Sequence, residues 1–133
     1  MAASDFKIKI AQACQAGEEF QKIYYDSLDK RRNKLSKLYS ADASLVWNGN
    51  ACSGSQQITK FYEQLPTSDF RVDTLDCQPI AEEATNGVTS VLVTVSGTVK
   101  FEGNRMQGFN QTFVLAQTGD VWKVASDSFR FHE

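Results

Sequence analysis

Few side chains in this sequence have the type and spacing that acid–base or nucleophilic chemistry needs. His132 is the single histidine, so neither a catalytic triad nor a histidine metal site is expected. Tyr24, Tyr39, Asp42 and Asp127 are candidate pocket groups. Nothing in their spacing predicts two carboxyls in different environments facing one cavity. We therefore predict that the chain is not an enzyme and has no catalytic residue, metal or cofactor.

The three cysteines, Cys14, Cys52 and Cys77, are far apart and form no Cys-x-x-Cys pair. An odd number of isolated cysteines favours reduced thiols in the cytosol or nucleus. Cys14 lies on an apolar helical stripe, where a buried thiol is expected.

Length and charge narrow the class of partner. A chain of 133 residues with 41% hydrophobic residues predicts one domain spanning residues 1–133. The net charge of -2 provides no general attraction to phosphates, so a protein partner is expected rather than nucleic acid. No signal peptide is evident at the start, and no apolar run approaches the roughly 20 residues of a membrane helix. A membrane partner is therefore not expected.

The first half of the sequence has helical periodicity. Ser4 and Asp5 offer a cap for a long helix whose apolar stripe runs from Phe6 to Leu28. A second, shorter helix is expected to carry Leu35, Leu38 and Tyr39 on its apolar face. Its opposite face holds a basic segment, Lys30 to Lys37, which we interpret as a solvated face; the alternatives are a nuclear localisation signal and a phosphate contact. The third helix is expected to be capped by Ser53 or Ser55 and to end at Pro66. Between them, Leu45–Trp47 followed by Asn48-Gly49 predicts a hairpin.

From residue 69 the period changes to two. The sequence predicts strands near residues 70–79, 88–101, 106–117 and 121–131, joined by turns rich in Gly and Asn. Helices followed by a four-stranded antiparallel meander make an α+β domain.

The two faces of this sheet differ in character. Between residues 88 and 101 the valine positions are expected to face the helices, and small residues with Leu92 and Thr94 form the other face. In the last strand we assign Trp122, Val124, Ser126, Ser128 and Arg130 to that outer face. Trp122 and Val124 would form an exposed apolar patch, which favours an interface. The alternative is that loops or the first helix cover this face.

Several short motifs, in this order and spacing, resemble the nuclear transport factor two-like family, and its export-related members most closely. They are Tyr24-Tyr25, Leu38-Tyr39, Leu45-Val46-Trp47-Asn48-Gly49, Asp76-Cys77-Gln78-Pro79, Gly97-Thr98-Val99-Lys100, Gly108-Phe109-Asn110-Gln111 and Asp127-Ser128-Phe129-Arg130-Phe131. The resemblance implies a cone-shaped half-barrel, with N-terminal helices packed in a bent, mainly antiparallel sheet. It also implies that two such domains pair through their sheet faces.

The resemblance further implies a partner and a cellular role. The partner is a Tap-type mRNA export receptor, with which the chain forms a heterodimer that supports mRNA export through the nuclear pore. Shuttling between nucleus and cytoplasm follows, with contact to nucleoporin Phe-Gly repeats through the complex. Asp76 and Arg130 match family positions that pair with opposite charges of the partner. Together with Leu92, Thr94, Ser128 and Trp122 they are the predicted partner-binding residues.

The alternative within the family is a homodimeric carrier of GDP-bound Ran. Carriers of this kind present three acidic residues at the open end of the cone. The matching positions here are Asn48, Glu102 and Asn104, so two of the three acids are replaced by amides. An amide supplies no charge to a lysine or arginine. Ran carriage is therefore not expected.

Overall fold

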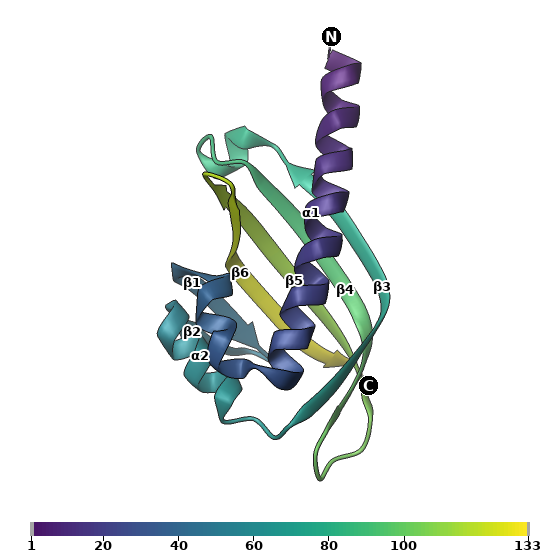
Figure 1. Cartoon of the computed structure of the whole chain (residues 1–133), viewed down its shortest axis with the longest axis vertical. Helices are drawn as coiled ribbons and strands as arrows, with labels where there is room; N and C mark the ends of the chain where they lie inside the picture. Colours follow the sequence, from purple (N-terminus) through teal and green to yellow (C-terminus); the bar gives the residue numbers. More distant parts are fainter. Residues whose placement is uncertain (1, 133) are drawn as a thin grey trace.

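The computed structural model describes residues 2–132, and Figure 1 shows its single bent sheet with one long helix lying across it. The elements are α1 (Ala2–Lys30), η1 (Arg32–Leu38), β1 (Tyr39–Trp47), β2 (Asn50–Ser53), α2 (Ser55–Glu63), β3 (Ser68–Ile80), η2 (Glu82–Thr85), β4 (Ser90–Phe101), β5 (Gln107–Thr118) and β6 (Val121–His132). In the described part of the chain, no helix is long and apolar enough to cross a membrane.

The six strands form one open sheet in the order β2-β1-β6-β5-β4-β3. The predicted antiparallel meander corresponds to β3 through β6. Beyond it, β1 pairs with β6 in parallel and with β2 in an antiparallel hairpin. The predicted α+β half-barrel, with helices packed in a bent and mainly antiparallel sheet, is confirmed (Figure 1).

The long helix α1 has the predicted apolar stripe from Ala13 onward, and Ala13, Phe20, Tyr24 and Leu28 are buried. The helix begins at Ala2, ahead of the expected cap at Ser4 and Asp5. The N-terminal turns project beyond the sheet in Figure 1, which explains why Ile10 is exposed although it continues the stripe. The side chain of Phe6 lies outside the described residues.

The short elements follow local backbone chemistry. Asn48 and Gly49 both have positive φ angles, 46° and 88°, which confirms the predicted hairpin turn. The cap of α2 is Gly54, so the predicted serine caps are wrong. The second helix is a 3₁₀ segment, and its Arg32 guanidinium donates to the carbonyl oxygens of Leu28, Tyr62, Leu65 and Pro66.

A β-bulge in β3 bends the sheet beside β4. The pairing steps from Val72 opposite Gly97 to Thr74 opposite Ser96, which leaves Asp73 as the extra residue. A Cβ atom at position 97 would lie 1.9 Å from the Arg71 carbonyl oxygen, so only glycine allows this approach. Because a bulge exchanges the two faces, Val72 packs against the core whereas Asp76 is exposed on the other side.

A second bulge lies in β6 and corrects one of the sequence predictions. Val114 pairs with Ser126, but the next residue, Leu115, pairs with Val124, so Ala125 is extra. Val124 is completely buried and Trp122 packs against the core. The prediction that Trp122 and Val124 share the outer face with Arg130 is therefore wrong.

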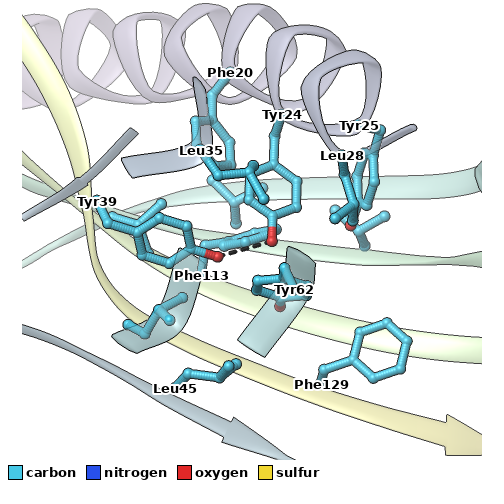
Figure 2. Close-up of a cluster of buried hydrophobic side chains, with 14 of the residues drawn as sticks. Phe20, Tyr24, Tyr25, Leu28, Leu35, Tyr39, Leu45, Tyr62, Phe113 and Phe129 are labelled. Atoms are coloured by element: carbon cyan, nitrogen blue, oxygen red, sulfur yellow. Dashed lines mark hydrogen bonds between the residues drawn. The ribbon is translucent and has the colours of Figure 1, made fainter. Parts of the chain in front are cut away.

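Stacked aromatic rings fill the part of the core where β1, β6 and β5 lie side by side. Phe129 of β6 is 2% exposed and stacks on Trp47 of β1, with ring centroids 3.9 Å apart and planes 5° from parallel. On its other side Phe129 stacks on Phe109 at 5.4 Å. Figure 2 shows Phe129 reaching from β6 toward this interior. The ring therefore joins three strands.

We expect Phe129→Ala to lower the free energy of unfolding by about 3–5 kcal/mol, because it leaves a cavity between two stacked rings. Urea denaturation followed by circular dichroism measures the change. The matched control is Ser128→Ala at the exposed neighbouring position, with an effect within about 0.5 kcal/mol. Equal losses in the two variants would contradict the assignment of the two faces.

Candidate partner interface

Five of the six predicted partner-binding residues lie on the face of the sheet that the helices leave open. On β4 the inward positions Val91, Val93 and Val95 are at most 3% exposed, whereas Leu92 is half-buried and Thr94 exposed. The predicted valine face is therefore confirmed, and its alternate positions form what we call the outer face.

A continuous row of side chains crosses this outer face. Asp76 of β3 lies opposite Thr94 of β4, and Thr94 lies opposite Thr112 of β5. Thr112 in turn lies opposite Ser128 of β6, which is next to Val46 of β1. Sequence reasoning predicted three members of this row but missed Thr112 and Val46. The alternation of Phe109, Phe113 and Leu115 along β5 was the signal that could have identified Thr112.

The adjacent rows place Leu92 and Arg130 on either side of this central row. Leu92 lies between Gln78 and Val114. Arg130 lies opposite Asn110, which is next to Ser96. Most side chains in the three rows are small or β-branched. The surface is therefore flat enough to accept another sheet.

Asp76 and Arg130 are the two charges among the predicted contacts, and they are far apart. They belong to β3 and β6, with two strands between them, so at least about 14 Å separates them at the usual strand spacing. Within the described part of the chain, the Asp76 carboxylate accepts a single hydrogen bond, of 3.3 Å, from the Gln78 amide. The two ion pairs found among residues 2–132 involve neither charge. Both charges are therefore available to a partner.

Trp122, the sixth predicted residue, lies on the helix side of the sheet instead. It lines a groove of about 470 Å³ between the N-terminal half of α1 and the end of the sheet. Apolar residues of that groove include Ala13, Ala16, Pro79 and Val91. In β6, bulky residues occur at both odd-numbered and even-numbered positions. This pattern was the sequence signal that the strand switches faces at a bulge.

Three of the candidate pocket groups, Tyr24, Tyr39 and Asp127, do come together, but in the core. The Asp127 carboxyl is 1% exposed and accepts hydrogen bonds from the Tyr39, Tyr62 and Tyr24 hydroxyls at 2.6, 2.8 and 3.4 Å. Its other oxygen accepts from the Gln111 amide at 2.8 Å. Figure 2 shows the Tyr24 and Tyr39 hydroxyls meeting at the centre, 2.8 Å apart. Asp42, the fourth candidate, is exposed on β1 and takes no part.

Electrostatics favours a structural role for this cluster. Burial raises the pKa of Asp127, and the four hydrogen bonds oppose that rise. Burial, followed by the nearby Asp127 charge, raises the pKa of Tyr24, Tyr39 and Tyr62 well above its usual value. Every hydrogen bond ends on another buried side chain, so a substrate could reach Asp127 only by opening the core. Among the described residues, no three His, Cys, Asp or Glu side chains gather as a metal site.

The three positions matched to Ran binding have local partners. The Asn48 side-chain oxygen accepts the Phe131 backbone N–H at 2.9 Å. The Asn104 amide donates to the Glu102 carbonyl oxygen at 3.3 Å, and the Lys100 ammonium donates to the Asn104 carbonyl oxygen at 2.8 Å. Of these three positions, Glu102 alone carries a negative charge.

Known proteins resemble this chain in sequence and in fold. The model of the nuclear transport factor 2 (NTF2) domain matches residues 16–131. NTF2-related export protein 2 of Homo sapiens is 54% identical, over 97% of this chain and 94% of that protein. The structure of nuclear transport factor 2 from Cryptosporidium parvum superposes with a TM-score of 0.79 at 27% identity, covering 91% of this chain and 95% of that one. A chain of the Candida albicans Mtr2–Mex67 M domain complex shares the fold, with a TM-score of 0.73 at 16% identity, covering 90% of this chain and 96% of that one.

The Asp127 cluster predicts a pH-dependent stability. Burial raises the pKa above its ordinary value of 3.8, so the folded chain holds this proton more tightly than the unfolded chain. The contribution of Asp127 to the free energy of unfolding is then greatest below pH 3.8, and it falls as the pH rises through the raised pKa of the folded state. We expect the free energy of unfolding of the wild type, minus that of Asp127→Asn, to decrease between about pH 4 and pH 7.

Urea denaturation of both proteins across this range measures the difference. Burial also raises the pKa of the half-buried Asp29. Asp29 is present in both proteins, so its contribution to the pH dependence cancels in the difference between their free energies of unfolding. A difference that grows with pH would mean that the hydrogen bonds outweigh the cost of burying the charge.

Proposed function

Because the chain belongs to the nuclear transport factor 2 domain family, we propose that it is a non-catalytic adaptor that forms a heterodimer with an mRNA export receptor. In this role it supports mRNA export and works in both the nucleus and the cytoplasm. A relative of 54% identity that covers nearly the whole chain is named as an export protein. The occurrence of the fold in the Mtr2–Mex67 M domain complex is compatible with pairing between unlike chains.

The observation that carries the proposal is the outer face itself. It spans β3 to β6 without a covering helix in Figure 1. Its central row, from Asp76 to Ser128, is composed of short side chains, which leaves room for larger side chains of an unlike partner. Asp76 and Arg130 would meet an opposite charge only from that partner. Thr94, Leu92 and Ser128 would supply the close packing between them.

The same face could serve a homodimeric carrier of GDP-bound Ran, but two observations favour the adaptor. Identity to the export protein is 54%, against 27% to the nuclear transport factor 2 structure. In addition, the side-chain oxygen of Asn48 is engaged by the backbone of Phe131. We therefore propose that Ran carriage is not a function of this chain.

We propose that contact with nucleoporin Phe-Gly repeats belongs to the assembled complex. The groove beside Trp122 is a concave surface of this chain, and a phenyl ring in it would contact the apolar lining residues, which include Ala13, Ala16 and Pro79. Trp122 would then bind a partner other than the receptor, on the opposite side of the sheet from Arg130.

The two separate charges, Asp76 and Arg130, give the sharpest test of the proposed interface. Asp76→Arg and Arg130→Asp are both expected to leave the domain folded, because the two side chains are exposed. Each reversal brings like charges together at the interface, so affinity for the receptor's domain should fall roughly a hundredfold or more. Calorimetric titration measures the affinity, and thermal melting by circular dichroism reports the fold.

The matched controls are Glu63→Arg and Lys60→Asp, reversals at exposed positions of α2 on the helix side of the sheet. These variants should bind the receptor as the wild type does. Normal pairing by both Asp76→Arg and Arg130→Asp would mean that another surface meets the receptor. Loss of fold in either variant would contradict their assignment as contact residues.

Binding to GDP-bound Ran is expected to be weaker than micromolar, because two charge-assisted hydrogen bonds, each about 1.5–3 kcal/mol, are missing at Asn48 and Asn104. Calorimetry with the purified GTPase measures it, using a homodimeric nuclear transport factor 2 as the positive control. Micromolar or tighter binding would support the carrier function instead.

A further inference from the structure

A thiol of the edge strand β3 packs closely against α1. Cys77 points to the inner side of β3, is half-buried, and packs against the core. Its sulfur lies directly over Gly17 of α1. A Cβ atom at position 17 would be 2.0 Å from the Cys77 sulfur and 3.1 Å from its Cβ atom. The missing side chain of Gly17 is therefore what allows the Cys77 thiol to reach the helix.

A second thiol lies on the same side of α1. Cys14 precedes Gly17 by three residues, so in a helix their Cβ positions are neighbours, about 5–6 Å apart. Cys14 is also half-buried and free. Burial raises the pKa of the Cys77 thiol to about 11, and Cys14, Asp76 and Glu18 add to that rise. The Cys77 sulfur therefore lies beside the stretch of helix that carries Cys14 and Glu18.

We propose that Cys14 and Cys77 form a reversible disulfide that ties α1 to β3 when the thiol pool becomes oxidised. To form the bond, the Cys77 sulfur would turn from Gly17 toward Cys14, which lies about one helical turn away along α1. The third cysteine, Cys52, lies on β2 at the opposite edge of the sheet and has no part in this pair. The proposal does not depend on the adaptor function.

The reaction is a thiol–disulfide exchange with glutathione disulfide as the oxidant. The Cys14 thiolate attacks one sulfur of glutathione disulfide, forming a mixed disulfide and releasing one glutathione thiolate. The Cys77 thiol then loses its proton to solvent and attacks the Cys14 sulfur, releasing the second glutathione. The two protein thiols are oxidised, and one glutathione disulfide is reduced to two glutathione molecules. Cys77 acts second because its raised pKa keeps it protonated at neutral pH.

The disulfide would close a loop from the N-terminal half of α1 to the far end of β3. This cross-link restricts the unfolded chain, and it also fixes the projecting helix against the edge of the sheet. The oxidised chain should therefore melt roughly 10 °C above the reduced chain.

Peptide mapping tests the proposal directly, because trypsin separates the three cysteines into peptides 10–22, 38–60 and 72–100. The reduced full-length chain is incubated with glutathione disulfide and digested without reduction. The expected product is peptide 10–22 joined to peptide 72–100, together with a loss of two hydrogens from the intact mass. Cys52→Ser should give the same product. Cys77→Ser should instead carry glutathione on Cys14, Cys14→Ser should leave the protonated Cys77 thiol largely free, and neither variant should show a rise in melting temperature.

Three results would overturn the proposal. They are a wild-type chain that carries only glutathione adducts, a link through peptide 38–60, and thiols that stay free under conditions that oxidise a model dithiol. Because no receptor takes part, none of these results bears on the pairing of the outer face.

Discussion

The fold depends on the burial of one carboxyl group. Asp127 lies 1% exposed at the centre of the core, where three hydroxyls and one amide donate to it. The donors come from α1, β1, α2 and β5, and Asp127 itself comes from β6. Burying an ionisable group is costly unless its hydrogen bonds are satisfied. No buried side-chain nitrogen or oxygen among the described residues lacks a partner, so the arrangement that satisfies Asp127 also sets the relative positions of five elements.

Because of this constraint, the two faces of the sheet differ in how far they tolerate substitution. The inner face has to fit the tyrosines and stacked phenylalanines, and it tolerates little change. The outer face carries residues such as Thr94, Thr112 and Ser128, none of which takes part in the core network. Partner recognition can therefore vary without disturbing the interior. Phe129 and Arg130 illustrate the division, since one side chain is buried among rings while its neighbour is exposed.

Local sequence was informative wherever one face of an element meets the core. The stripe of α1, the Asn48-Gly49 turn and the valines of β4 were predictable for that reason. The bulges at Asp73 and Ala125 were not, because a bulge depends on the pairing with a neighbouring strand. The second bulge moved Trp122 from the predicted interface to the groove. Tyr24, Tyr39 and Asp127 were recognised as candidates, but Tyr62 and Gln111 were missed since only tertiary packing brings them together.

The order of the strands has a consequence for synthesis on the ribosome. β1 (Tyr39–Trp47) is made early, but one of its two neighbours in the sheet is β6 (Val121–His132), the last strand to emerge. Until then the nascent chain lacks Asp127 and Phe129, and the β1–β2 hairpin has no sheet to join. Pairing between such distant segments is slow to form and leaves apolar surface exposed in the meantime. The sheet therefore cannot close around Asp127 until β6 has been made, and the early elements cannot reach their final arrangement before then.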